Sequence, residues 1–155
     1  MTWSIRHVRV VDISQVVSIE ESSFPKPWDT DVFRILASWG GRVSVQRGKT
    51  VYMDVIVDED SVLGYIVWQE DRDILQGHIL NIAVIRSMRR RGVGRVLLKH
   101  AFETMRGHDI KECMLEVRES NTAAQALYAS GGMTLSRKEP GYYEEEDALI
   151  YAIRL

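Results

Sequence analysis

The hydrophobic and polar positions of the chain follow two periods, one typical of strands and the other of amphipathic helices. The segment "WSIRHV" alternates like a first strand, and two helical patterns follow it, separated by Pro25 and Pro27. The side chain of Asp12, and that of Asp29 or Thr30, are placed to cap these two helices. The elements predicted in this part of the chain are a strand over 3–8 and helices over 12–19 and 30–37.

The second part of the chain alternates strand and helix patterns more regularly. The runs "TVYMDVIV" and "SVLGYIVWQE" flank the acidic turn "DEDS", which is typical of a hairpin. "HILNIAVI" is almost continuously apolar, which predicts a strand covered on both faces. Asn121 is placed to cap a short helix that ends at two glycines, 131 and 132. The predicted strands cover 50–57, 61–70, 78–85, 112–118, 133–137 and 147–155, and the predicted helices cover 93–101 and 122–130.

This order of elements predicts one α/β (α+β) domain over residues 1–155. We expect a mixed, mostly antiparallel sheet of six to seven strands, flanked by about four helices. A chain of 155 residues is long enough to bury a single sizeable core.

Composition excludes several classes of protein. The net charge is −2, so a basic cluster is a local feature, which argues against a dedicated nucleic-acid-binding protein. Cys113 is the only cysteine, which excludes an internal disulfide and a multi-cysteine zinc site. The four histidines show no metal-ligand spacing, so no metal is expected. No apolar run approaches the ~18 residues of a membrane helix, and the N-terminus does not resemble a secretory signal, so we expect a cytoplasmic protein without membrane attachment.

The segment "IRSMRRRGVGRVLLKH", residues 85–100, places five arginines and a lysine around the start of a predicted helix. Cations are unfavourable at a helix N-terminus, because this end carries a partial positive charge. They become favourable if an anion binds the unpaired N–H groups there, and glycine lets the chain approach such a ligand closely. The alternative is a solvated basic turn. The spacing matches neither a Walker A loop nor a dinucleotide-binding fingerprint.

The pattern Arg89-x-x-Gly92-x-Gly94 resembles the R/Q-x-x-G-x-G/A loop of the GNAT superfamily of acyl-CoA-dependent N-acetyltransferases. The segments "IEESSFPKPW", "NIAV…RRRGVGRVLL", "LEVRESNTAAQALYASGGM" and "GYYEEEDALIY" are similar to successive parts of RimI-like and archaeal protein N-terminal acetyltransferases. The resemblance covers essentially the whole chain and is weakest over 37–62. It implies a GNAT fold and transfer of acetyl from acetyl-CoA to the α-amino group of protein N-termini.

The resemblance also implies how acetyl-CoA, the co-substrate, would be held. Backbone groups of one strand would contact the pantetheine arm, Asn121 would hydrogen-bond it while also capping its helix, and Tyr128 would lie near the sulfur. The arginine-rich loop would wrap the pyrophosphate. The implied residues are Ile82, Ala83 and Val84 in the strand, and Arg89, Arg90, Arg91, Gly92, Val93, Gly94 and Arg95 in the loop.

The same resemblance implies catalytic roles for two residues. Glu116 would act as the general base, through water, and Tyr128 as the general acid toward the sulfur. An α-amine with a pKa of about 7.7–8.0 is already partly neutral at pH 7, so the base has less to do than with a lysine substrate. Archaeal relatives can use a glutamate of the N-terminal segment, which leaves Glu20 or Glu21 as a rival base. We expect direct transfer in a ternary complex, because no cysteine is placed to form an acetyl-enzyme.

The resemblance also implies a peptide-binding side made of aromatic and proline residues. Phe24, Pro25 and Trp28 resemble one wall of the peptide pocket in these acetyltransferases, and Tyr142 and Tyr143 resemble the facing loop. Each set also has a packing explanation. The expected partners are protein or peptide N-termini, with ribosomal proteins among the candidates, and we expect a monomer or weak dimer. The alternatives are an acetyltransferase for lysine, polyamine or another small amine, and a non-catalytic acyl-CoA- or RNA-binding module.

Overall fold

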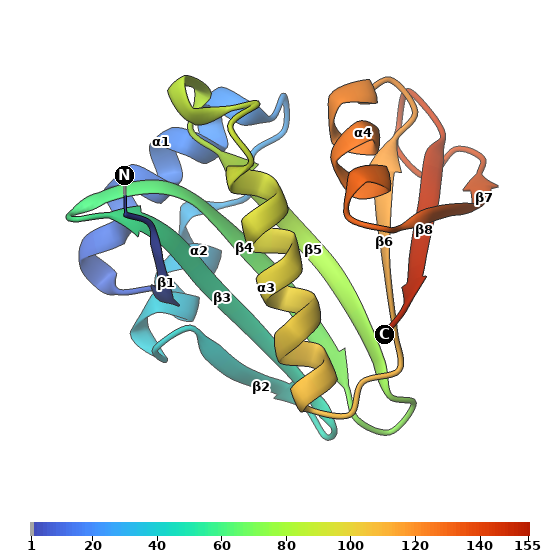
Figure 1. Cartoon of the computed structure of the whole chain (residues 1–155), viewed down its shortest axis with the longest axis horizontal. Helices are drawn as coiled ribbons and strands as arrows, with labels where there is room; N and C mark the ends of the chain where they lie inside the picture. The colour runs from blue at the N-terminus through green and yellow to red at the C-terminus, as the bar shows by residue number, and fades with distance from the viewer. Residues whose placement is uncertain (1) are drawn as a thin grey trace.

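The computed structural model describes residues 2–155 and contains eight strands and four α-helices (Figure 1). The strands are β1 (Ser4–His7), β2 (Arg42–Gln46), β3 (Lys49–Asp58), β4 (Ser61–Asp71), β5 (Gln76–Val84), β6 (Glu112–Arg118), β7 (Thr134–Glu139) and β8 (Ala148–Arg154). The helices are α1 (Ile13–Ser23), α2 (Thr30–Ser38), α3 (Val93–Gly107) and α4 (Thr122–Ser130). Short 3-10 turns precede α1 and α3, at Val10–Asp12 and Arg86–Met88.

All strands belong to one mixed sheet in the order β1-β3-β4-β5-β6-β8-β7, with β2 paired to β3 beside this path. Every pairing is antiparallel except that of β5 with β6, which is parallel. The parallel pairing is short, running from Gln76 opposite Glu112 only as far as His78 opposite Met114. Beyond this point the two strands diverge, which Figure 1 shows as β6 turning away from β5 toward α4.

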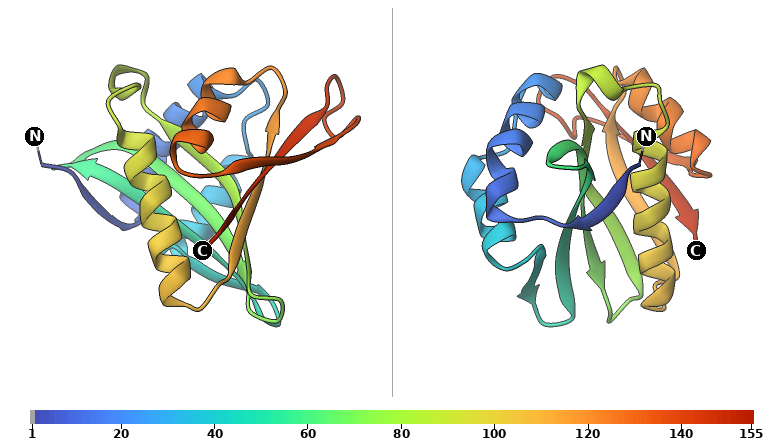
Figure 2. Two further views of the ribbon diagram at one scale, coloured as in Figure 1. Left: turned by 45° about the vertical axis from the view of Figure 1, so that its right-hand side comes forward. Right: turned by 60° about the vertical axis from the view of Figure 1, so that its left-hand side comes forward.

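Helices cover both faces of the sheet and bury one apolar cluster on each. Helix α3 lies across one face, whereas α1 and α2 lie on the opposite face (Figure 2). Ile66 and Trp68 of β4 pack in the cluster under α3, and Tyr65 and Val67 pack in the cluster under α1 and α2. The strict alternation of these neighbours between the two faces is the period-2 pattern of a fully covered strand. The central strands therefore form a rigid platform for the groups at their ends.

The predicted architecture is confirmed, with one strand more than the sequence indicated. Strand β2 (Arg42–Gln46) is short and mostly exposed, and it pairs only with β3. Edge strands of this kind bury little apolar surface, so their hydrophobic pattern is weak. The predicted hairpin forms between β3 and β4, and the side chains of Asp29 and Asn121 cap α2 and α4 as expected.

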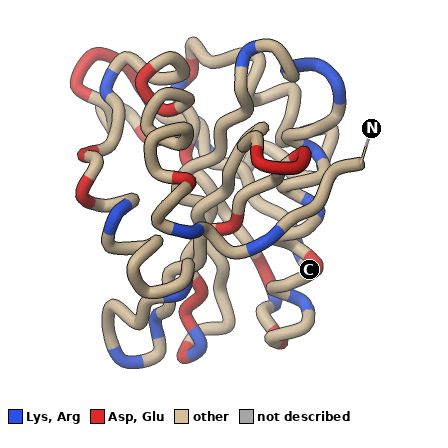
Figure 3. The backbone as a smooth tube through the Cα atoms, turned by 90° about the vertical axis from the view of Figure 1, so that its left-hand side faces the viewer, with Lys and Arg blue, Asp and Glu red and all other residues tan. Residues whose placement is uncertain are grey.

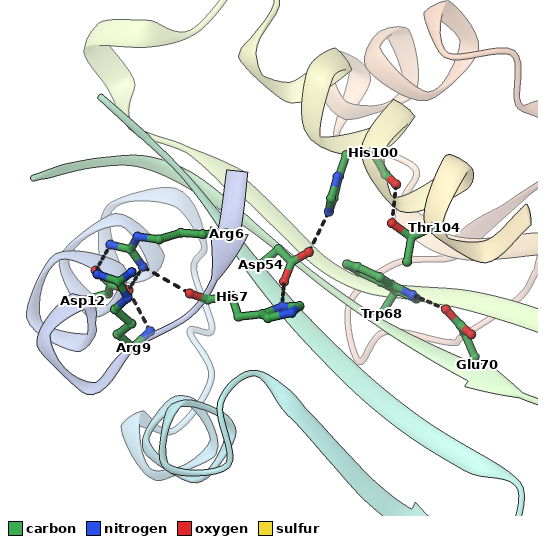
Figure 4. Close-up of polar contacts among 9 residues, drawn as sticks. All are labelled: Arg6, His7, Arg9, Asp12, Asp54, Trp68, Glu70, His100 and Thr104. Carbon is green, nitrogen blue, oxygen red and sulfur yellow. Dashed lines mark hydrogen bonds and ion pairs between the residues drawn. The ribbon is translucent and has the colours of Figure 1, made fainter. Parts of the chain in front are cut away.

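Two local expectations are wrong. The side chain of Asp12 does not cap α1. Its carboxylate instead accepts hydrogen bonds from the Arg6 guanidinium at 2.7 and 2.9 Å and from the Arg9 backbone N–H at 2.8 Å (Figure 4). Strand β5 is not covered on both faces: buried positions alternate with half-buried ones, and Leu80 is exposed, because the strand borders the divergence from β6.

Buried carboxylates fasten α3 and β1 to the sheet. Asp54 of β3 accepts hydrogen bonds from His7 Nδ1 at 2.7 Å and His100 Nε2 at 2.6 Å, so it joins β1 to α3 (Figure 4). Glu70 of β4, fully buried, accepts from Trp68 Nε1 at 2.9 Å and contacts His108 Nδ1 at 2.8 Å. These contacts fix the position of α3, whose N-terminus lies beside the end of β5.

Acidic and basic positions are interspersed on the side of the molecule nearest β1 (Figure 3). This side of the described chain therefore presents no continuous surface of one charge. Among residues 2–155, no helix is both long enough and apolar enough to cross a membrane.

Candidate active site

The divergence of β5 and β6 creates an opening in the sheet. Val67 of β4 pairs with Asn81, whereas the next residue, Trp68, pairs with Ile79, so Leu80 is an unpaired bulge residue in β5. A bulge bends its strand and increases the local twist. The backbone edges of β5 from Ile79 onward and of β6 from Leu115 onward consequently face each other without pairing. An extended ligand can lie in this opening and hydrogen-bond either edge, as an added strand would.

A cavity of about 380 Å³ occupies the opening and extends to the loops beside it. Its walls are the bulged part of β5, the end of β6, the start and middle of α4, the segment between α1 and α2, and the loop between β7 and β8. The residues lining it are Glu20, Phe24, Pro25, Lys26, Trp28, His78, Ile79, Leu80, Asn81, Ile82, Leu115, Glu116, Val117, Arg118, Asn121, Tyr128, Tyr142 and Tyr143.

The sequence-predicted residues fall into two groups in space. Both proposed catalytic residues, all five aromatic and proline residues of the substrate side, and two cofactor residues line the cavity: Phe24, Pro25, Trp28, Ile82, Glu116, Asn121, Tyr128, Tyr142 and Tyr143. The remaining cofactor residues lie outside its lining, at the end of β5 and the start of α3: Ala83, Val84, Arg89, Arg90, Arg91, Gly92, Val93, Gly94 and Arg95. The first group can surround an acyl and peptide site, and the second can form a separate anion site at the end of the same strand.

The turn before α3 has the backbone geometry of an anion site. Arg90 and Gly92 both adopt left-handed conformations, with φ of 61° and 86°. Left-handed residues alternating with extended or right-handed ones turn successive N–H groups inward, and such strain in a non-glycine residue is typical of functional sites. In the part of the chain that the structure describes, no side chain caps α3. Its first N–H groups therefore stay available, and within residues 2–155 no carboxylate pairs with Arg90, Arg91 or Arg95.

Gly94 allows the start of α3 to pack closely against its neighbours. A Cβ at this position would lie 3.1 and 3.3 Å from the methyl groups of Leu127 in α4, and 3.7 Å from Val84 at the end of β5. The absence of a side chain therefore brings the N-terminus of α3, the end of β5 and α4 together. These are the three elements around the far end of the opening.

Arg89 differs from the other arginines of this turn because its guanidinium is already bonded within the protein. Nε donates to the Val84 carbonyl at 3.0 Å, and Nη2 donates to Ser23 Oγ at 3.0 Å. Ser23 is the last residue of α1, directly before the substrate-side segment 24–28. Arg89 therefore links the turn before α3 to segment 24–28, in addition to any contact that it makes with a ligand.

The arrangement fits a long thiol cofactor that carries a pyrophosphate. Uncapped helix N–H groups and unpaired arginines match a diphosphate, because both supply charge-assisted hydrogen bonds. The open backbone edges of β5 and β6 match an amide-containing arm. Within the described residues, no three His, Cys, Asp or Glu side chains are grouped to bind a metal ion.

Glu116 lies at the cavity wall, on the same face of the sheet as His78. Its Oε1 accepts hydrogen bonds from His78 Nε2 at 2.8 Å and from the Tyr142 hydroxyl at 3.2 Å. Burial raises the pKa of Glu116, but the hydrogen bonds from His78 and Tyr142 outweigh it, so the pKa lies below its ordinary value of 4.5. Glu116 is therefore ionised near neutral pH, and an ionised carboxylate only accepts, so His78 Nε2 carries the proton of this contact.

Tyr128 faces the cavity from α4, where its side chain is almost completely buried. Burial raises the pKa of its phenol above the ordinary value of 10.0, so Tyr128 stays protonated at neutral pH. Asn121 lies at the start of the same helix, and its Oδ1 accepts from the Ala124 N–H at 3.1 Å. This cap leaves the amide NH₂ of Asn121 available on the cavity side.

The structure shows where the two glutamates of α1 lie that are alternatives to Glu116 as the general base. Glu20 is buried and lines the cavity, and both of its oxygens accept hydrogen bonds. Glu21 is exposed and does not line the cavity. Lys26 pairs with Glu144 at 2.8 Å, and this ion pair bridges the two loops at the mouth of the cavity.

Sequence reasoning missed part of the lining. The only signal for His78 in the sequence was its position at the start of the apolar strand that precedes the arginine-rich turn. Asn81 carried a signal, because it is a polar residue within an apolar strand. Arg118 had no such signal: its guanidinium lies 4.2 Å from the centroid of the Tyr143 ring and 3.2 Å from Glu146, contacts that depend on the folded loop.

Cys113 is buried in β6, and burial raises the pKa of its thiol to about 12. A thiol of this kind is neither exposed nor ionised at neutral pH, so it is a poor nucleophile. Cys113 is therefore a structural residue that packs in the apolar cluster under α3.

Fold and site together show a sheet that divides between β5 and β6, with an uncapped, arginine-rich helix N-terminus beside the division and an ionised carboxylate in the cavity wall. The sequence profile of the acetyltransferase (GNAT) family matches residues 13–133, and the chain belongs to this family.

Full-length relatives carry more specific names. A Bacillus subtilis protein, provisionally named a ribosomal protein bS18-alanine N-acetyltransferase, is 33% identical over 150 residues, which cover 95% of this chain and 92% of the relative. An N-alpha-acetyltransferase of Saccharolobus solfataricus is 30% identical over 163 residues, covering 97% of this chain and 92% of the relative. The crystal structure of Ard1 from Thermoplasma volcanium matches with a TM-score of 0.83 at 23% identity, covering 100% of this chain and 99% of that one, and shows that the two share a fold.

Proposed function

We propose that this protein transfers the acetyl group of acetyl-CoA to the α-amino group of protein N-termini. The observation that carries the proposal is the placement of two features along one opening in the sheet. An uncapped, arginine-rich helix N-terminus lies at one end, and the Glu116–His78 pair lies on the cavity wall at the other. One elongated cofactor lying along β5 can contact the N-terminus of α3 and present its acyl group to the Glu116–His78 pair.

When bound, acetyl-CoA supplies the thioester whose acyl carbon the amine attacks. The N–H groups of residues 93–95, with Arg90 and Arg91, hold the diphosphate. The free edge of β5, including Ile82, Ala83 and Val84, holds the arm, together with the Asn121 amide. These contacts fix the reacting end, which is the main contribution of a protein to a two-substrate transfer.

Glu116 accepts the proton that the amine loses, directly or through one water. Its Oε1 is held by His78 and Tyr142, and its Oε2 has no hydrogen-bond partner among the described residues, so Oε2 is the oxygen left to accept this proton. Because the pKa of Glu116 is lowered, the carboxylate is in its proton-accepting form throughout the neutral range. His78 orients it and stabilises its charge.

Tyr128 donates a hydrogen bond to the leaving sulfur. Its phenol keeps its proton at neutral pH, and a coenzyme A thiolate needs only modest assistance to leave, because a thiol has a pKa of about 8.5. The buried, protonated Cys113 supports direct transfer from cofactor to amine without an acetyl-enzyme.

A peptide N-terminus reaches Glu116 through the mouth of the cavity. Phe24, Pro25 and Trp28 form one side of this mouth, and Tyr142 and Tyr143 form the other. The curated relatives are named for N-terminal acetylation, and two of them cover this chain almost completely. A ribosomal protein with an N-terminal alanine is one candidate substrate, since the Bacillus subtilis relative is named for that activity.

The test is incubation with acetyl-CoA and a library of peptides that differ in their first two residues, read by mass spectrometry with fragmentation to locate the acetyl group. We expect acetylation at the α-amine and none at internal lysines. Modification of lysine side chains, or of free polyamines in preference to peptides, would assign a different acceptor. Binding of acetyl-CoA without turnover on any amine would contradict catalysis.

A further inference from the structure

Glu20 is a buried carboxylate in the wall of the candidate active site that the reaction does not use. It lies in α1 and is 2% exposed, and it accepts hydrogen bonds from three different elements. Asn81 Nδ2 donates to Oε1 at 2.8 Å, the Tyr65 hydroxyl donates to the same oxygen, and the Trp28 backbone N–H donates to Oε2 at 2.9 Å. Within residues 2–155, both oxygens of Glu20 therefore act as hydrogen-bond acceptors and neither is left without a partner.

The three donors come from the parts of the site that must be aligned. Asn81 follows the bulge of β5, Tyr65 lies on the neighbouring strand β4, and Trp28 ends the substrate-side segment 24–28. None of these donors carries a charge. Glu20 therefore connects β4 and β5 to segment 24–28, and its buried oxygens are satisfied by these neutral donors.

Aromatic packing reinforces the same connection. The Trp28 ring stacks on Phe33 of α2 with centroids 5.5 Å apart, and Phe33 packs edge-on against Tyr65 at 5.7 Å. Tyr65 in turn donates to Glu20, which accepts from the Trp28 backbone. The contacts form a closed ring, so the position of segment 24–28 depends on the Glu20 carboxylate.

We propose that Glu20 is a positioning residue that sets the affinity for the peptide by fixing segment 24–28 over the open part of β5. This inference rests on the proposed function and identifies a determinant of acceptor binding within the same site. Glu20 is distinct from the base, because both of its oxygens are engaged, whereas Oε2 of Glu116 has no hydrogen-bond partner among the described residues.

The experiment compares Glu20→Gln with Glu21→Gln, a matched control at the adjacent exposed position. In Glu20→Gln an amide NH₂ must face one of the donors, so segment 24–28 loses an anchor. We expect the KM for the peptide to rise about tenfold, with the calorimetric Kd for acetyl-CoA within twofold of wild type. The kcat should stay within twofold of wild type, whereas replacement of the base Glu116 should lower it about 100-fold. Glu21→Gln should leave all three measurements unchanged.

The double variant Glu20→Gln with Asn81→Asp tests the contact itself. The carboxylate introduced at position 81 accepts from the amide NH₂ introduced at position 20, while the side-chain carbonyl of that amide accepts from the Trp28 N–H. The exchange restores one donor and one acceptor to the contact between α1 and β5. We expect the peptide KM to return to within about threefold of wild type.

Each failure has a separate reading. If wild type acetylates no peptide, the proposed function fails. If wild type is active and Glu20→Gln keeps the wild-type peptide KM, or lowers kcat about 100-fold instead, the positioning role is overturned. If Glu20→Gln does not fold by circular dichroism, Tyr65→Phe decides, because it removes one donor and keeps the carboxylate: a peptide KM raised about threefold supports the role, and an unchanged KM overturns it.

Discussion

At the scale of single residues, one carboxylate of β6 carries the proposed chemistry. Glu116 and Glu112 lie on the same strand and face, yet only Glu116 contacts His78 and the cavity, while Glu112 accepts a hydrogen bond from Gln76 at the surface. Position relative to the divergence of β5 and β6 therefore separates a catalytic candidate from an ordinary strand carboxylate.

Replacing Glu116 with Gln should lower kcat by about 100-fold, within the usual contribution of a general base. The Kd for acetyl-CoA should stay within twofold, because Glu116 touches the acceptor side. Timed assays of peptide acetylation give kcat, and calorimetry gives the Kd for acetyl-CoA. Glu112→Gln is the control and should keep full activity; equal activity of both variants would show that another group takes the proton.

The pH dependence of wild type should follow the acceptor amine and not Glu116. The pKa of Glu116 lies below 4.5, so its carboxylate stays ionised as the pH falls from 9 to 6. The α-amine, with a pKa near 8, becomes protonated over that range, and kcat/KM should fall about tenfold per pH unit below it. If the midpoint of the pH dependence of kcat/KM moves with the pKa of the peptide amine, the prediction holds. A midpoint that is the same for all peptides would contradict it.

At the scale of elements, the N-terminus of α3 is a site only because its turn and its neighbours cooperate. The left-handed Arg90 and Gly92 aim backbone N–H groups, and Gly94 brings the helix against β5 and α4. The basic sequence pattern indicated an anion there. It could not show that Arg89 also bonds Ser23, because these two residues lie 66 positions apart in the chain.

Replacing Arg90 and Arg91 together with Ala should weaken acetyl-CoA binding at least tenfold, because each supplies a charge-assisted contact to the diphosphate. The weakening should shrink at high salt, since exposed charges are screened. Calorimetry at two salt concentrations measures this, with thermal unfolding to confirm an intact fold. Arg106→Ala, at the opposite end of α3, is the control. Equal affinities of wild type, the double variant and Arg106→Ala for acetyl-CoA would show that this turn does not bind the diphosphate.

The Asp54 contacts predict a pH-dependent contribution to stability. Burial raises the pKa of Asp54, but the hydrogen bonds from His100 and His7 outweigh it and hold the pKa below 3.8. A lowered pKa in the folded state stabilises the protein above the unfolded value and ceases to do so as pH falls through the folded value. Asp54→Asn should therefore lower the free energy of unfolding by about 3 kcal/mol at pH 7.

The difference between wild type and Asp54→Asn should shrink below about pH 4, where the carboxyl of the unfolded chain begins to protonate, and should continue to shrink as the pH falls through the lower pKa of the folded state. Urea unfolding at several pH values measures it. Asp58→Asn, at the end of the same strand, controls for the loss of a surface charge. A difference that stays constant down to pH 3 would show that the Asp54 charge does not fasten β1 and α3.

At the scale of the whole molecule, the order of elements followed from hydrophobic periodicity, whereas the opening that makes the site did not. The Leu80 bulge and the end of the β5–β6 pairing at His78 arise from strands that meet across the sheet. "HILNIAVI" consequently looked like a fully covered strand. The expectation for Asp12 failed for a different reason, because a capping pattern does not reveal that Arg6, six residues earlier, competes for its carboxylate.

Candidate catalytic and substrate residues could be named from the sequence because several coincide with motif positions. Glu116, Tyr128 and the aromatic residues of both loops line one cavity, although they lie far apart in the chain. Glu20 was visible only as one of two adjacent glutamates. Its burial and its three donors separate it from Glu21, and burial follows from the rotation of α1 against the sheet, which the sequence pattern defines only approximately.

The most direct test of the account is a crystal structure of the protein with bound acetyl-CoA. We predict the diphosphate on the N–H groups of residues 93–95 beside Arg90 and Arg91, the arm between the open edges of β5 and β6, and the acyl group near Glu116 and Tyr128. A cofactor bound in any other crevice, with the β5–β6 opening empty, would contradict it.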